Sequence, residues 1–142
     1  MNKIFVYGIF MLLNVAIFVS CSSSAVAHGP AQTDSSQWGE EVSVNTVAAM
    51  KGKDGVVVLD VREPDEYAEA HIPGVLHIPM GQVMARKAEF INAETVFVTC
   101  RSGHRSGRVT AALRAEGHAN VINMAGGIKA WKAAGHPVES GK

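Results

Sequence analysis

Short apolar runs alternate with polar and amphipathic segments from residue 41 to residue 134. The runs at 56–61 and 95–100 are continuous and rich in β-branched residues, as expected of strands that are covered on both faces. Shorter apolar segments predict three more strands, at 41–44, 75–78 and 120–124. Helices are predicted between them at 46–51 with Asn45 as the N-cap, at 63–70, weakly at 81–90, at 105–116 and at 128–134.

Strands that alternate with helices predict a three-layer α/β/α domain with a five-stranded, mostly parallel sheet. We place this domain at residues 39–139, behind a polar leader at 28–38 that contains Pro, Gly and Ser. Ligands of such sheets bind beyond the carboxyl ends of the strands. Asp60 and Cys100 lie at or next to two of these ends, so the pattern alone makes them candidate site residues.

The first 27 residues have the pattern of a signal peptide. Lys3 precedes an apolar stretch at 4–19, which is short for a membrane span, and Ala25-Val26-Ala27 offers a cleavage site. Two alternatives remain open: a lipoprotein signal that ends before an acylated Cys21, and an uncleaved anchor. In each case we expect the domain to lie outside the cytoplasmic membrane, in a bacterial periplasm, with membrane attachment only through the lipid or the anchor.

Composition narrows the possible classes of protein. The 142 residues include 13 Lys and Arg against 13 Asp and Glu, so a nucleic-acid partner held by net positive charge is not expected. Two cysteines cannot build a disulfide framework. Cleavage after Ala27 would leave Cys100 as the single thiol, which makes the neighbours of this residue informative.

Cys100 opens a loop, Cys-Arg-Ser-Gly-His-Arg-Ser, that joins a buried strand to the start of a helix. Backbone N–H groups of a tight loop can converge on an anion, and the helix start adds further N–H groups and a positive dipole end. A sulfur at this place is expected to be stabilised as the nucleophilic thiolate. We expect substrate-binding groups at Arg101, Ser102, Gly103, His104, Arg105 and Ser106, with His104 exposed and replaceable.

These residues resemble the active-site loop of the rhodanese-homology family, in which Cys is followed after four residues by Arg and Ser. Three further segments are similar to family signatures in the same order, at 59–63, 71–79 and 126–131. The resemblance covers residues 40–139 and implies a rhodanese-like sheet in which the second and fourth strands are adjacent. It also implies a sulfurtransferase that carries sulfane sulfur as a persulfide on Cys100, loaded by thiosulfate or a similar anionic donor and unloaded by cyanide or a thiol, without metal or organic cofactor.

Other functions remain as alternatives. A sulfur-relay module would load a persulfide for a protein thiol but turn over cyanide poorly. Phosphatases of related design have five residues between Cys and Arg, a longer loop than the four residues between Cys100 and Arg105. A thiol-redox sensor would need a nearby resolving cysteine, and the mature chain would offer none. The sequence does not predict the oligomeric state.

Several polar residues near the loop have structural explanations. Asp60 is expected to support the site by capping backbone N–H groups or by pairing with Arg105, and Arg62 is expected to be solvated or hydrogen-bonded. The spacing of His71 and His77 does not fit a compact zinc site, so we assign them to turn and strand structure.

Overall fold

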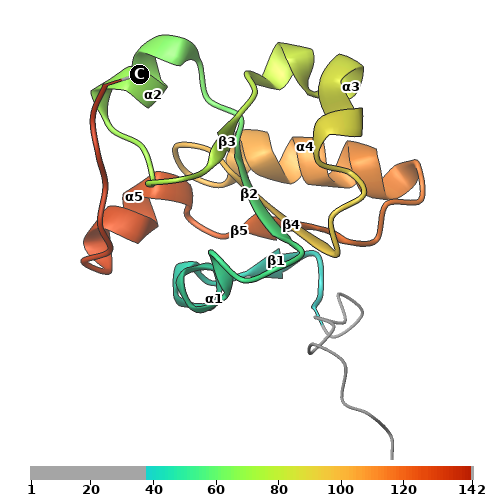
Figure 1. Ribbon diagram of the computed structural model, residues 1–142, viewed down its shortest axis with the longest axis horizontal. Coiled ribbons are helices and arrows are strands. Elements are labelled where there is room, and N and C mark those ends of the chain that lie inside the picture. The colour runs from blue at the N-terminus through green and yellow to red at the C-terminus, as the bar shows by residue number, and fades with distance from the viewer. Residues whose placement is uncertain (1–37, 142) are drawn as a thin grey trace, which may run out of the picture.

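The computed structural model describes residues 38–141; the predicted signal peptide and most of the leader lie outside this range. Its centre is a five-stranded sheet in the order β1-β5-β4-β2-β3, and every neighbouring pair of strands is parallel. The strands are β1 (Glu41–Val42), β2 (Val56–Asp60), β3 (Leu76–His77), β4 (Thr95–Thr99) and β5 (Val121–Met124). The adjacent position of β2 and β4 confirms the arrangement that the family resemblance implies (Figure 1).

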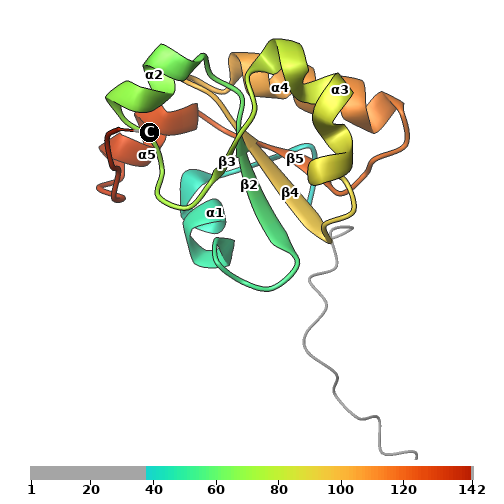
Figure 2. The same ribbon diagram turned by 45° about the horizontal axis from the view of Figure 1, so that its top comes forward.

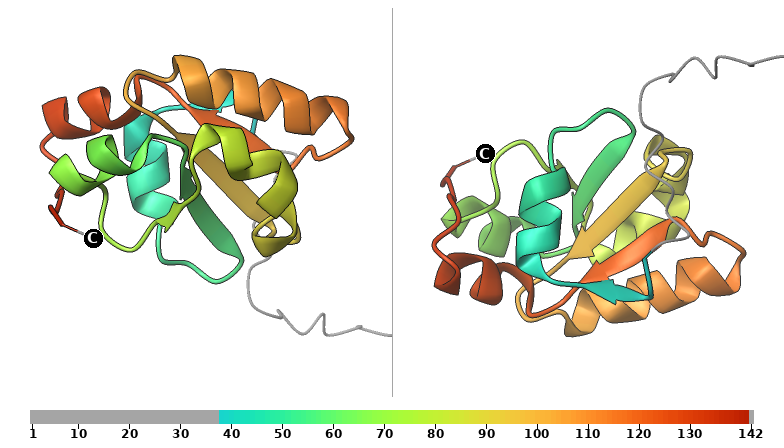
Figure 3. Two further views of the ribbon diagram at one scale, coloured as in Figure 1. Left: turned by 90° about the horizontal axis from the view of Figure 1, so that it is seen from above. Right: turned by 90° about the horizontal axis from the view of Figure 1, so that it is seen from below.

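Helices cover both faces of the sheet, so the three-layer prediction is confirmed. They are α1 (Val44–Met50), α2 (Pro64–Glu69), α3 (Val83–Arg86), α4 (His104–Ala115) and α5 (Gly127–Ala133), with 3-10 turns η2 (Met80–Gln82) and η3 (Lys87–Glu89) on either side of α3. Seen from above, α3 and α4 lie in front of the strands, and seen from below α1 does (Figure 3). None of the helices in residues 38–141 is long and apolar enough to cross a membrane.

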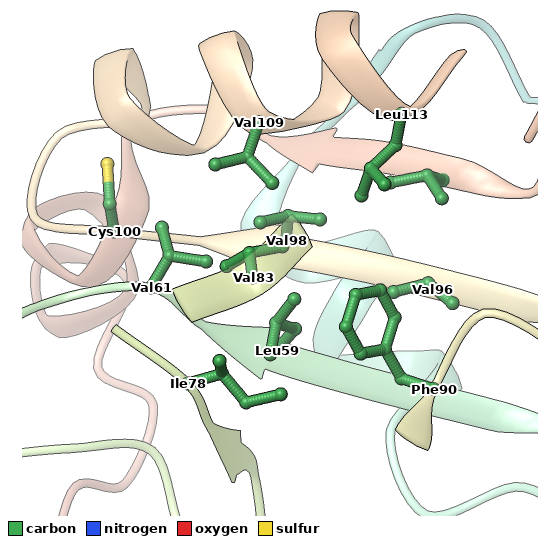
Figure 4. Packing of buried hydrophobic residues seen from close by; sticks show 11 residues of the cluster. Leu59, Val61, Ile78, Val83, Phe90, Val96, Val98, Cys100, Val109 and Leu113 are labelled. Carbon is green, nitrogen blue, oxygen red and sulfur yellow. The ribbon is translucent and has the colours of Figure 1, made fainter. Parts of the chain in front are cut away.

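Alternate residues of the strands supply two separate cores. On β4, Val96 and Val98 pack toward α3 and α4 in the cluster that Figure 4 shows, whereas Phe97 packs on the opposite face with α1 and α5. The period-2 geometry of a strand sends neighbouring side chains to opposite faces, and burial of both sets explains the continuous apolar run. Trp131 of α5 is buried in the second cluster.

The start of the domain differs from the prediction. Helix α1 begins at Val44, and its N-cap is Ser43, whose Oγ accepts a hydrogen bond from the Thr46 N–H at 3.2 Å. Asn45 lies inside the helix and is not the cap. The strand predicted at 41–44 includes Ser43, and because Ser43 caps α1 the observed strand β1 has only two residues.

The two ends of the described chain pack against the domain. Trp38, the last residue of the predicted leader, is partly buried and lies edge-on to Phe97 with ring centroids 6.5 Å apart. At the other end the chain returns to α2, where Glu139 pairs with His71 in an antiparallel bridge (Figure 2). The end of α2 and the segment that leaves it are therefore held from outside by the C-terminal residues.

Candidate active site

The carboxyl ends of β2 and β4 bring the two strand-end candidates together. Asp60 is in register with Thr99, and Cys100 follows Thr99 directly. Asp60 and Cys100 therefore lie at the ends of neighbouring strands, as the family resemblance implies. Figure 4 shows the sulfur of Cys100 at the margin of the apolar cluster, directed toward the start of α4 and away from the other labelled side chains.

The loop after Cys100 folds back so that hydrogen-bond donors reach the sulfur. The Gly103 N–H donates to Sγ at 3.2 Å, and the Ser106 hydroxyl donates to Sγ at 3.4 Å. Gly103 has φ of 91°, in the left-handed region that favours glycine, and α4 begins at the next residue. The tight turn thus places the sulfur at the N-terminus of a twelve-residue helix.

These contacts change the acidity of the thiol. Burial raises the pKa of Cys100, but the Ser106 hydroxyl and the backbone N–H groups of Ser106, Ser102 and Gly103 lower it by a larger combined amount. The pKa of Cys100 therefore lies below its ordinary value, because all four donors favour the thiolate. The site holds a cysteine prepared to act as a nucleophile.

Helix α5 supports the loop through hydrogen bonds to the loop backbone. The Ile128 N–H donates to the Cys100 carbonyl at 2.8 Å, and the Lys129 N–H donates to the Arg101 carbonyl at 3.1 Å. A Cβ at Gly127 would lie 2.3 Å from the Cys100 carbonyl oxygen, so this approach requires glycine. The sequence does not predict this support, although Gly126 and Gly127 belong to the segment 126–131 that is similar to a family signature.

Arg105 binds a carboxylate of α2 and makes no hydrogen bond to the Cys100 sulfur within residues 38–141. Its guanidinium makes two hydrogen bonds of 2.7 Å to the carboxylate of Glu66 on α2. This bond raises the pKa of Arg105, and the negative charge of a Cys100 thiolate raises it further. In return, Arg105 lowers the pKa of Glu66. Glu66, which the sequence did not single out, thus ties α2 to the loop and offsets part of the cationic charge near the sulfur.

Asp60 accepts a hydrogen bond from the Arg62 backbone N–H at 3.0 Å, which agrees with the predicted capping role, and its carboxylate pairs with the Arg62 side chain and not with Arg105. The Arg62 guanidinium donates to both carboxylate oxygens of Asp60, with a shortest distance of 2.6 Å, and to the carbonyls of Glu66 and Ala70. The side chains are 4% and 0% exposed, so of the two expectations for Arg62 the hydrogen-bonded one is correct and the solvated one is not. Burial is possible because the pair satisfies its own charges and the carbonyls use the remaining donors.

The other predicted residues lie around this centre. Arg101, Ser102 and His104 are exposed, and Ser102 contributes its backbone N–H to the thiolate and not its hydroxyl. His71 and His77 stack on opposite faces of Tyr67 with centroid distances of 3.9 Å and 4.1 Å, which agrees with a structural assignment. Among residues 38–141, no group of three or more His, Cys, Asp or Glu residues is arranged to hold a metal ion.

Comparison with known proteins identifies the class that this fold and loop define. The model of the rhodanese-like domain family matches residues 43–134. The chain therefore belongs to the rhodanese-like family.

Individual relatives agree with this class. The chain is 39% identical to a sulfurtransferase of Allochromatium vinosum over 83 residues, which cover 58% of this chain and 78% of that protein. It is 42% identical over 74 residues to the "Putative sulfur carrier protein YrkF" of Bacillus subtilis, covering 52% of this chain and 40% of the relative. A solved structure of a thiosulfate sulfurtransferase from Pseudomonas aeruginosa superimposes with a TM-score of 0.65 at 31% identity, covering 73% of this chain and 20% of that one.

These names support a rhodanese-type role in sulfur transfer. The chain spans less than two thirds of the length of several curated relatives, including YrkF.

Proposed function

We propose that this protein is a sulfurtransferase that carries sulfane sulfur as a persulfide on Cys100, with thiosulfate or a similar small anion as the donor. The observation that carries the proposal is the group of donors around Sγ: the Gly103 N–H, the Ser106 hydroxyl and the N–H groups of Ser102 and Ser106. They favour a thiolate, which is the form that attacks a sulfane donor. The same donors can hold the terminal sulfur of the persulfide that results.

The proposed loading step needs no redox partner. The Cys100 thiolate attacks the outer sulfur of thiosulfate, a new S–S bond forms, and the S–S bond of thiosulfate breaks. Sulfite leaves with the electron pair of that bond, and the protein retains one extra sulfur as Cys100–S–S⁻. An acceptor such as cyanide or a thiolate then attacks the terminal sulfur, and the electron pair of the broken bond returns to Cys100.

The test is thiocyanate formation from thiosulfate and cyanide by the purified domain and by Cys100→Ser. We expect turnover and a mass increase of one sulfur atom for the parent protein, and neither for the variant. Thiocyanate formation that survives in Cys100→Ser would falsify the assignment. A protein that gains the sulfur but releases it slowly to cyanide would select the alternative, a sulfur-relay module that serves a partner protein; the sulfur-carrier name of one relative favours this alternative.

We further propose that the domain works outside the cytoplasmic membrane. The support is the basic, apolar and small-residue pattern of residues 1–27. N-terminal sequencing of the mature protein should begin at His28. A blocked, lipid-modified N-terminus at Cys21 would instead show attachment to the membrane, and an intact N-terminus in a cytoplasmic fraction would contradict export.

A further inference from the structure

A pocket of about 140 Å³ lies where the edge strand β1 and its neighbour β5 meet α4. These three elements run side by side at one margin of the domain (Figure 3). We call this space the β1–α4 pocket. Its lining residues are Glu40, Glu41, Gly107, Thr110, Ala111 and Asn123, and none of them belongs to the loop at 100–106 that surrounds the sulfur.

Two side chains that line this pocket carry buried oxygen atoms without a partner. Thr110 and Asn123 are only 2% and 5% exposed. Within residues 38–141, neither Oγ1 of Thr110 nor Oδ1 of Asn123 takes part in a hydrogen bond. Since a buried polar atom without a partner lowers stability, both oxygens call for a ligand that the described part of the chain does not supply.

Two carboxylates line the same pocket. Glu41 is in register with Asn123, and its Oε2 accepts a hydrogen bond from Asn123 Nδ2 at 2.6 Å. Neither Glu41 nor Glu40 takes part in a salt bridge within residues 38–141. Arg114, one turn further along α4 than Thr110, donates to two backbone carbonyls instead. The pocket thus has two carboxylates that no cation of the described residues pairs with.

Gly107 leaves space beside the Asn123 amide. It lies within α4 and is not among the glycines with positive φ, so its backbone conformation does not require glycine. A Cβ at this position would lie 3.5 Å from Asn123 Nδ2, which is an ordinary contact distance. Alanine would fit here and would favour the helix. What the missing side chain provides is therefore room in the pocket.

We infer that the β1–α4 pocket binds a hard divalent cation, and that Ca²⁺ suits it best. Apart from Asn123 Nδ2, the polar side-chain atoms of the lining are oxygens of carboxylate, amide and hydroxyl groups. Ca²⁺ accepts this mixture in a flexible geometry and completes its shell with water, for which the pocket has room, whereas Mg²⁺ requires stricter octahedral geometry. Glu40 and Glu41 together balance the two positive charges.

A cation at this place would fasten the edge of the sheet to α4. Strand β1 has only two residues, and the ligands come from β1, β5 and α4, which the unfolded chain does not hold together. Binding therefore favours the folded state. With two carboxylates and two neutral oxygens, we expect a Kd of about 0.1–1 mM, the range of extracellular calcium-binding modules.

The experiment titrates CaCl₂ into purified protein that has been treated with a chelator. Isothermal titration calorimetry measures the Kd, and thermal unfolding measures the stabilisation. At 10 mM CaCl₂ we expect the unfolding midpoint to rise by about 5 °C relative to a KCl solution of the same ionic strength. The same titration with MgCl₂ should give a Kd at least tenfold weaker, because Mg²⁺ tolerates an irregular oxygen site poorly.

Three variants assign the binding to this pocket. Glu41→Gln keeps an oxygen for the Asn123 amide but removes a charge, so the Kd for Ca²⁺ should rise by about tenfold. The matched control is Glu69→Gln, the same change on an exposed carboxylate of α2, and its Kd should equal that of the parent. Thr110→Val replaces the unpaired hydroxyl by a methyl group. It should keep the unfolding midpoint without Ca²⁺ and raise the Kd by about threefold.

Several results would overturn the inference. One is the absence of both binding heat and a midpoint shift at 10 mM CaCl₂. Another is an equal effect of CaCl₂ and MgCl₂, or a loss of affinity in Glu69→Gln as large as in Glu41→Gln, since the cations would then respond to overall charge. A third is a Kd of Thr110→Val equal to that of the parent. None of these measurements involves sulfur transfer, so the cation site stands or falls independently of the proposed function.

Discussion

Gly127 lies so close to Cys100 that a Cβ on Gly127 would be 2.3 Å from the Cys100 carbonyl oxygen and 2.8 Å from the Ser102 nitrogen. The contact joins the start of α5 to the backbone that shapes the sulfur site. Because two hydrogen bonds from α5 also end on this backbone, the loop and the helix start form one unit. The geometry around the Cys100 sulfur is thus set both by the loop itself and by the start of α5.

Gly127→Ala should therefore lower sulfur transfer by more than the loss of stability from backbone strain accounts for. The methyl group must push the Cys100–Ser102 backbone away, which moves the N–H donors from Sγ and raises the pKa of the thiol. We expect at least a tenfold loss of sulfur transfer, beyond the roughly 1–2 kcal/mol of stability that a left-handed alanine costs. Thermal unfolding and the pH dependence of Cys100 alkylation measure the two effects.

The control for this variant is Gly135→Ala. Gly135 also has positive φ, 78°, but a Cβ there meets nothing within 4 Å. It should lose similar stability from backbone strain and keep the alkylation profile of the parent protein. If both variants alkylate alike, the close approach of α5 does not shape the loop.

Ser106→Ala should raise the pKa of Cys100. The hydroxyl that donates to Sγ disappears, while burial, which favours the neutral thiol, remains. Since only the thiolate reacts, the alkylation rate of the parent should reach half its maximum at a lower pH than for an ordinary thiol, and this midpoint should move upward in the variant. Ser102→Ala is the matched control, because Ser102 acts through its backbone N–H, which alanine retains. Equal midpoints for both variants would contradict the hydroxyl contribution.

The sequence predicts most reliably those elements whose residue pattern fits only one structural environment. The runs that form β2 and β4 are apolar at every position because both faces are covered, and no exposed strand or helix would tolerate them. The β1–α1 boundary was wrong because Ser43 suits both an alternating strand and a helix cap. A two-residue edge strand gives no further signal to decide between them.

The candidate site also contains residues that the sequence predicts and one important residue that it does not. Cys100, Gly103 and Ser106 were predicted together because they are adjacent in the sequence and act through local turn geometry. The partner of Arg105 is 39 residues away, and no local pattern distinguishes Glu66 from the neighbouring carboxylates of α2. Only the packing of α2 against the loop selects it.

The Arg105–Glu66 pair predicts two substitutions with opposite effects on the sulfur. Glu66→Gln removes the carboxylate that offsets Arg105, so the pKa of Cys100 and the KM for thiosulfate should both fall. Arg105→Gln removes the cation, so both should rise, by about two- to fivefold in KM for a partly exposed charge. Each variant loses the same ion pair, worth about 1 kcal/mol or less, so thermal unfolding should not separate them. If the KM for thiosulfate shifts in the same direction and by the same amount in both variants, the Arg105–Glu66 pair has only a structural role.

Asp60→Asn should be the most destabilising of these changes, because it leaves Arg62 buried without its counter-ion. Breaking a buried pair costs about 3–5 kcal/mol, and Arg62 also loses the orientation that lets it bind the Glu66 and Ala70 carbonyls. The comparison is Glu89→Gln, which removes the carboxylate of the Arg86–Glu89 pair, 39% and 44% exposed, and should cost under about 1 kcal/mol. Urea unfolding measures both. A similar small loss in the two variants would show that Asp60 does not secure α2 to the sheet. In that case, its place beside Cys100 would have to be explained by the chemistry of the sulfur.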